Sequence, residues 1–119
     1  MQNEIIHNIL SIPERFKRAN NISVNDLLKE TGYFQKYESV TEENIKEILL
    51  VNYEYIDVWS SYSEDKRSES GYYFKYDNNN YVVGYLDKSG KVSEKRYSEK
   101  VDACASFIKS EIEEIRKLS

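Results

Sequence analysis

Few side chains in this sequence could carry out catalysis. His7 is the one histidine of the chain, and Cys104 is the one cysteine. A single nitrogen ligand and a single sulfur ligand cannot close a zinc site. His7 lies in the N-terminal segment, where we expect it to face solvent or to pack. Cys104 lies on an apolar stripe, and we expect a small core residue there, because a reactive thiol needs an exposed, cationic setting.

Carboxylates are numerous, but their spacing does not favour acid–base catalysis. Glu64 and Asp65 are neighbours in an expected loop, and are not the opposed pair that glycoside hydrolysis requires. The DNNN segment at 77–80 lacks the glycine and glutamate of an EF-hand loop, so it predicts a turn. No phosphate-binding glycine motif is present. We therefore predict no enzyme, no cofactor and no metal site; a hydrolase that uses carboxylates alone stays open, without residues that favour it.

The composition indicates one ordered domain, residues 1–119. The chain has 119 residues, one proline and four glycines, with no internal repeat and no Pro-rich or Gly/Ser-rich linker. A single cysteine allows no disulfide within the chain. The start, MQNEIIHNIL, lacks the basic region of a signal peptide, and no apolar run approaches the roughly 20 residues of a membrane span. We expect a cytoplasmic protein with no membrane partner.

Negative charge is concentrated in the middle of the chain. Residues 41–87 hold ten acidic and four basic residues, whereas residues 1–40 are balanced and residues 88–119 have two more bases than acids. This distribution argues against a nucleic-acid partner, because phosphate binding requires clustered lysine and arginine. It permits a basic protein partner, which the opposite field would attract. The alternative is an acidic surplus that serves solubility.

The first half of the chain predicts helices. Four apolar residues share one helix face at spacings of four, three and four: Ile5, Ile9, Ile12 and Phe16. Pro13 predicts that a new helix starts near Ile12. A further helix is expected from Ser23, as N-cap, to Gly32. The clearest helix follows Thr41, also as N-cap, and runs to about Asn52.

The region from Tyr53 to Tyr97 predicts strands. Eight of the 11 tyrosines lie between Tyr53 and Tyr85, and aromatic residues favour strands. The alternation in YEYIDVWSSY predicts a first strand over 53–62, followed by a loop over 63–70. GYYFKY, YVVGYL and KVSEKRY predict three more strands, joined by turns at DNNN and DKSG, with the last strand at an edge.

A long helix is expected over about 98–118, with Ser98 as N-cap and an apolar stripe that includes Val101, Cys104, Ile108 and Ile112. The predicted fold class is therefore α+β. N-terminal helices precede an antiparallel β-meander of three to four strands, and the C-terminal helix packs on that sheet.

Tyrosines of so small a sheet cannot all lie in its core, so some must face outward beside carboxylates. Tyrosine and tryptophan suit protein interfaces, because each gives a large rigid contact with a polar tip. The alternative is that these tyrosines cover the open face and pair across strands.

Three segments of the chain resemble small bacterial immunity proteins: LLKETGYF, WSSYSEDKRSESGYYF and YVVGYLDKSGKVSEKRYSEKVDACASFIKSEIEEIR. Such proteins are encoded beside the toxins of polymorphic and contact-dependent growth inhibition systems. The likeness covers the chain from about Val24 onward, and its most distinctive part is W-x-x-Y-S-E-D-K-R. It implies a cytoplasmic protein that binds one cognate toxin domain and blocks its active site or its substrate cleft. Such toxins are frequently nucleases with basic clefts.

The leading hypothesis is therefore a non-enzymatic inhibitor of a cognate toxin domain, expected to be a basic nuclease. Carboxylates would meet the lysines and arginines that otherwise hold phosphate, and aromatic residues would anchor the contact. The predicted partner-binding residues are Glu54, Tyr55, Asp57, Trp59, Glu64, Asp65, Tyr72, Tyr76 and Asp77. Two alternatives are a phage- or plasmid-borne inhibitor or nucleic-acid mimic that acts on a host enzyme, and a small-ligand-binding module whose pocket the tyrosines line.

Overall fold

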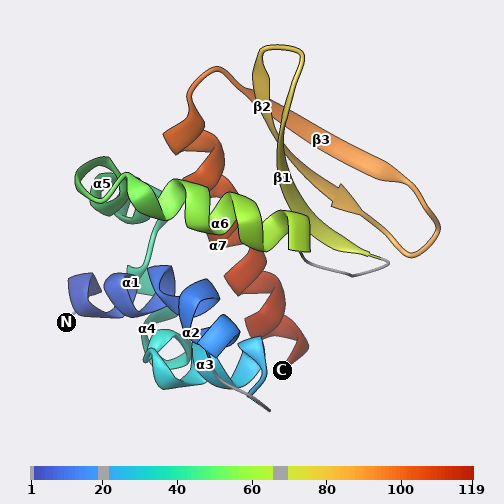
Figure 1. Cartoon of the computed structure of the whole chain (residues 1–119). Helices are drawn as coiled ribbons and strands as arrows, with labels where there is room; N and C mark the ends of the chain where they lie inside the picture. The colour runs from blue at the N-terminus through green and yellow to red at the C-terminus, as the bar shows by residue number, and fades with distance from the viewer. Residues whose placement is uncertain (1, 19–21, 66–69) are drawn as a thin grey trace.

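Helices occupy both ends of the chain and a three-stranded antiparallel sheet lies between them, in a computed structural model that describes residues 2–18, 22–65 and 70–119 (Figure 1). The predicted α+β fold, with its long C-terminal helix on the sheet, is confirmed. In chain order the elements are α1 (Gln2–Leu10), α2 (Ile12–Arg18), α3 (Val24–Glu30), α4 (Tyr33–Lys36), the short 3-10 helix η1 (Tyr37–Ser39), α5 (Glu42–Val51), α6 (Glu54–Asp65), β1 (Gly71–Asp77), β2 (Asn80–Leu86), β3 (Val92–Tyr97) and α7 (Lys100–Leu118).

The sheet has the order β1-β2-β3, so β3 is an edge strand, as its polar sequence predicts. Asn78 and Asn79 turn the chain between β1 and β2 with φ angles of 49° and 67°, which asparagine tolerates better than most residues. The register places Tyr76 opposite Tyr81 and Phe74 opposite Val83. The predicted hairpin turn at DNNN is confirmed.

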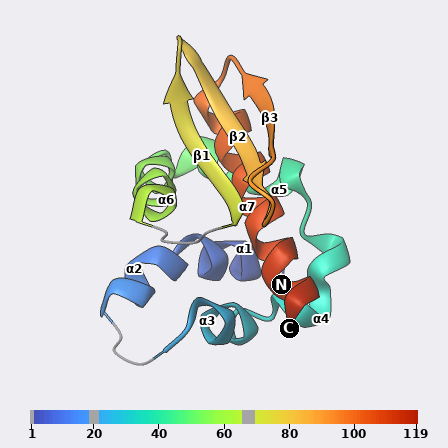
Figure 2. The same ribbon diagram turned by 90° about the vertical axis from the view of Figure 1, so that its right-hand side faces the viewer.

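Helix α7 covers one face of this sheet (Figure 2). Phe74 stacks on Phe107 of α7 with 5.9 Å between ring centroids, and the Tyr97 hydroxyl lies 2.9 Å from the Ser106 hydroxyl. The N-cap position of α7 is Glu99, whose side chain makes no capping hydrogen bond. The expectation of Ser98 in that role is therefore wrong by one residue.

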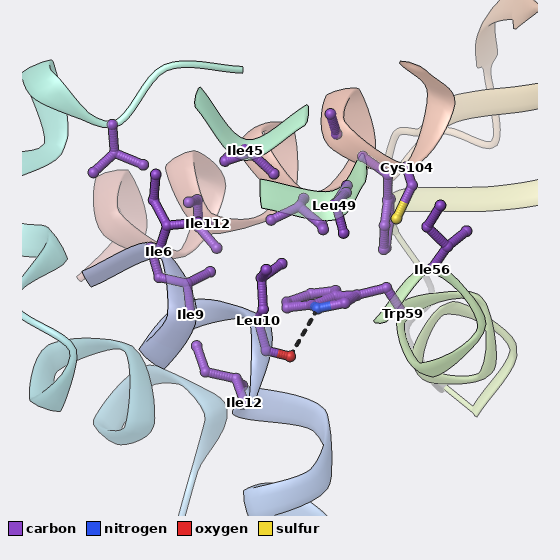
Figure 3. Packing of buried hydrophobic residues seen from close by; sticks show 14 of the residues in the cluster. Ile6, Ile9, Leu10, Ile12, Ile45, Leu49, Ile56, Trp59, Cys104 and Ile112 are labelled. Atoms are coloured by element: carbon purple, nitrogen blue, oxygen red, sulfur yellow. Dashed lines mark hydrogen bonds between the residues drawn. The ribbon is translucent and has the colours of Figure 1, made fainter. Parts of the chain in front are cut away.

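The main core lies where α1, α5, α6 and α7 meet (Figure 3). Its fully buried side chains include Ile6, Ile9, Leu49, Trp59 and Ile112. Cys104 lies among them with no exposed area, which confirms its prediction as a core residue. Burial raises the pKa of its thiol to about 12, so the sulfur stays protonated and unreactive at neutral pH.

The expected helix starts in the first half are present, with one correction. α2 begins at Ile12, and the side chains of Ser23 and Thr41 cap α3 and α5 by accepting from Asp26 N and Asn44 N. Phe16 does not continue the buried face of α1 and α2, because its side chain is exposed. The spacing of Ile5, Ile9, Ile12 and Phe16 places them on one face only if the helix is continuous. The chain instead turns at Ser11, so the faces of α1 and α2 are not aligned.

The prediction of a first strand over residues 53–62 is wrong, because this segment forms most of α6. Ile56, Trp59 and Ser63 are buried at spacings of three and four, which is a helical period. The expected loop over 63–70 is wrong at its start, since Ser63–Asp65 complete α6; residues 66–69 lie outside the described residues. Packing against the core overrides the strand preference of tyrosine, valine and tryptophan here.

Candidate protein-binding surface

Four of the predicted carboxylates lie on one exposed side of α6. Glu54, Asp57, Glu64 and Asp65 are all exposed, and their positions in the helix fall within one stripe about 100° wide. We call these four residues the acidic stripe. Trp59 lies on the opposite side of the same helix. The helix that was expected to be a strand therefore aligns carboxylates that a strand would have placed on two faces.

Asp57 also ties α6 to α7. Its carboxylate accepts a hydrogen bond from Lys100 Nζ at 2.9 Å, and this bond raises the pKa of the lysine. The Asp57 side chain nevertheless keeps 79% of its surface exposed. An exposed pair of this kind contributes little to stability. Because its side chain is largely exposed, Asp57 remains accessible to a partner.

The acidic character extends onto α5. Residues 41–65 contain seven carboxylates and one lysine. That lysine, Lys46, forms a salt bridge with Asp102 of α7 at 2.7 Å, so its charge is compensated. Glu43 and Glu47 are exposed on the outward side of α5. The α5–α6 pair therefore presents a negative surface to solvent.

Trp59 does not belong to this surface, which corrects its prediction as an interface anchor. Its side chain is 1% exposed, and its indole N–H donates to the Leu10 carbonyl at 3.1 Å (Figure 3). Its ring packs edge-on against Tyr62 and Phe107. Trp59 therefore fixes α6 to the end of α1 from the side of the helix opposite the acidic stripe.

The three predicted tyrosines lie at different places. Tyr55 is half-buried and packs against the core, and Tyr72 is half-buried with its ring edge-on to Tyr85 at 4.7 Å. Tyr76 is the exposed one, at 61%, and packs beside Tyr81. Tyr76 borders a groove of about 250 Å³ that Ser60 of α6 and Lys100 also line, so it lies near the acidic stripe.

Asp77 lies on the other face of the sheet, away from α7. Residues alternate along β1, and Phe74 points to α7, so Tyr73, Lys75 and Asp77 point outward. Asp77 pairs with Arg96 of β3 at 3.2 Å on that face. The structure does not bring Asp77 together with the acidic stripe.

The outward face of the sheet is covered by its own side chains. The Tyr73 ring lies over Gly84, and its hydroxyl donates to the Glu94 carboxylate at 2.5 Å. Burial and this hydrogen bond raise the pKa of Tyr73 to about 12. Lys75 approaches the same carboxylate at 3.8 Å. Tyr73 therefore covers the open face of the sheet, as the alternative to an interface role predicted. The Tyr72–Tyr85 and Tyr76–Tyr81 pairs lie on the other face, toward α7.

Three exposed apolar residues near the acidic stripe were missed from the sequence. Leu50, Val51 and Tyr53 are 53%, 79% and 53% exposed at the junction of α5 and α6. The sequence pattern could have identified two of them. Leu50 and Val51 lie outside the apolar stripe formed by Ile45 and Leu49 in the predicted helix, which indicates that their side chains face solvent.

The structure gives no metal-binding cluster in the part of the chain that it describes. No three histidine, cysteine, aspartate or glutamate side chains there are placed to hold a metal ion. None of the described helices combines the length and apolar character that a membrane span requires. What the arrangement offers chemically is a rigid row of carboxylates beside exposed apolar side chains.

Comparison with known proteins returned no match among family models, curated proteins or solved structures. The role of the chain must therefore be inferred from its own residues and geometry.

Proposed function

We propose that this chain is an immunity protein that binds a cognate toxin domain and neutralises it. The toxin domain has a basic cleft of the kind found in nucleases, and α6 occupies that cleft. The observation that carries this proposal is the acidic stripe, in which one rigid helix holds Glu54, Asp57, Glu64 and Asp65 on a single exposed side. The resemblance in sequence supports the same role.

The length and charge of the stripe suit a cleft that binds nucleic acid. From Glu54 to Asp65 the helix rises about 16 Å, at about 1.5 Å per residue. Carboxylates spread over that length can pair with several lysines or arginines that otherwise contact phosphates. Binding at this place would exclude the substrate both by charge and by volume.

The stripe is already ordered before a partner arrives. Trp59 anchors the inner side of α6, and Ser63 near its end accepts from the Phe74 N–H of β1 at 2.8 Å. A preformed surface loses less conformational entropy on binding than a loop that must become ordered. This rigidity favours a tight complex.

Two carboxylates of the stripe lie where helix stability disfavours them. Glu64 and Asp65 occupy the last turn of α6, which contains no basic residue. The helix dipole places partial negative charge at that end, so acidic side chains there are unfavourable by a few tenths of a kcal/mol each. A binding role accounts for carboxylates at this end of the helix.

The proposal is tested by expressing the toxin domain encoded beside this gene with and without the chain. We expect the chain to restore growth and to elute with the toxin domain as a stable complex in gel filtration. The variant Glu54→Gln/Glu64→Gln/Asp65→Asn should weaken both effects, because it removes three charges from the stripe. The matched control, Glu4→Gln/Glu38→Gln/Glu99→Gln, neutralises three exposed carboxylates elsewhere. Toxicity that persists with the wild-type chain present would contradict the proposal.

A further inference from the structure

The junction of α5 and α6 exposes apolar surface that the fold does not need. Leu50, Val51 and Tyr53 are each more than half exposed, and Val51 reaches 79%. We call these three residues the α5–α6 corner. Exposed apolar side chains are ordinary when scattered, but three within four positions form a local patch. The junction lies at the left edge of the molecule in Figure 1, and the exposed fractions place these three side chains in contact with solvent.

The core is complete without these side chains. Ile45 and Leu49 of α5 have no exposed area, and Ile56 of α6 has none either. The outward side of α5 instead carries Glu43 and Glu47 before it ends at the corner. A helix built for stability alone would continue with polar residues on that side.

Carboxylates border the corner on both helices. Glu47 lies one helical turn before Val51, and Glu54 directly follows Tyr53; both are exposed. Lys46, one helical turn before Leu50, is paired with Asp102 at 2.7 Å, and Lys100 is paired with Asp57 at 2.9 Å. Carboxylates therefore border the apolar patch, and the two lysines beside it are already paired, so charge complementarity selects a basic occupant.

We infer that the α5–α6 corner is the central anchor of the interface and inserts into an apolar pocket bordered by lysine and arginine on the basic partner. This inference rests on the proposed function and adds which residues dominate binding. Interfaces place their binding energy in a desolvated centre with apolar or aromatic anchors, and charged residues form the rim. The corner has the composition of such a centre, and the acidic stripe has that of a rim.

The different roles of the α5–α6 corner and the acidic stripe have a measurable kinetic consequence. Truncation of a central anchor mainly speeds dissociation, whereas loss of rim charges mainly slows association. The corner residues should therefore control the lifetime of the complex, and the stripe residues should control how fast the complex forms.

The test measures binding of the purified full chain to the co-expressed toxin domain by surface plasmon resonance. Leu50→Ser/Val51→Ser should raise the dissociation rate on the order of tenfold or more, while its thermal unfolding midpoint stays near that of the wild type. The matched control is Leu118→Ser/Val92→Ser, which removes one leucine and one valine that are exposed elsewhere, and it should leave binding unchanged. Tyr53→Ala gives a second, independent reading.

The outcomes separate the two proposals. Wild-type chain that does not bind the toxin domain overturns the proposed function together with this inference. Binding that survives in both corner variants, but weakens when the acidic stripe is neutralised, overturns the inference and leaves the proposed function in place. Equal weakening in the corner variant and in its matched control also overturns the inference.

Discussion

At the scale of single residues, Glu113 of α7 is the centre of a cluster of polar side chains. Its carboxylate accepts from Arg116 Nε at 2.8 Å and Nη2 at 3.0 Å, and from the hydroxyl of Tyr33. Lys109 donates to the same hydroxyl at 2.8 Å and to the Val40 carbonyl at 2.6 Å. The cluster fastens α4 and the segment after it to α7, and thereby supports the start of α5.

The Glu113 cluster predicts a specific loss of stability in acid. Hydrogen bonds from Arg116, and then from Tyr33, lower the pKa of Glu113 from 4.5 to about 2. A carboxyl group with a lowered folded-state pKa stabilises the fold above its unfolded pKa, and this stability is lost as the pH falls toward the folded value. The thermal unfolding midpoint should therefore fall between about pH 4.5 and pH 2, and Glu113→Gln should flatten that fall. Glu99→Gln serves as the exposed control, and an unchanged slope in Glu113→Gln would contradict the account.

At the scale of elements, the sheet protects its outward face by covering a glycine with an aromatic ring. Tyr73 of β1 lies opposite Gly84 of β2, and Glu94 of β3 completes the row. A Cβ atom at Gly84 would lie 2.2 Å from Tyr73 Cζ, so the ring occupies the space that any other residue would need. The arrangement links all three strands across the face that α7 does not cover.

This arrangement predicts that the effect of Gly84→Ala depends on Tyr73. In the wild type, the substitution must displace the ring and its hydrogen bond to Glu94, and we expect a loss of roughly 1 kcal/mol of unfolding free energy. In a Tyr73→Ala background the space is free, and alanine should stabilise the strand by roughly 0.5–1 kcal/mol over glycine. Urea denaturation of the four proteins in this cycle measures the difference. The same effect in both backgrounds would show that the ring does not occupy this site in solution.

Elements with local signals are predictable from the sequence, whereas α6 was predicted as a strand and the short helices α4 and η1 were not predicted. Thr41 caps α5 through a neighbour three residues away, and Asn78–Asn79 form a turn by themselves. The segment 54–65 contains tyrosine, isoleucine, valine and tryptophan, which favour strands. Its helical state depends on distant packing, since Trp59 bonds to a carbonyl 49 residues earlier in the chain.

The candidate surface was predictable in part for the same reason. The charge distribution identified Glu54, Asp57, Glu64 and Asp65, but their alignment follows from the helix and could not be seen in a strand model. Residue type also led to the wrong prediction of Trp59 as an interface residue, because tryptophan is as suited to a core as to an interface. Only the three-dimensional arrangement separates these two uses.

At the scale of the whole molecule, charge is distributed unevenly. The α5–α6 pair is strongly negative, whereas residues 88–119 contain more bases than acids. An asymmetric field of this kind orients an approaching basic protein and raises its association rate. We therefore expect the negative face to meet the partner first.

The most direct test of that claim is the dependence of the association rate on salt. Stopped-flow association of the chain with the toxin domain should slow steeply between low and physiological ionic strength, because salt screens charges over about 8–10 Å. The variant Glu54→Gln/Glu64→Gln/Asp65→Asn should show a shallower slope than the wild type, and Glu4→Gln/Glu38→Gln/Glu99→Gln should keep the wild-type slope. An association rate that does not change with salt, or an equal slope in both variants, would contradict binding through the acidic stripe.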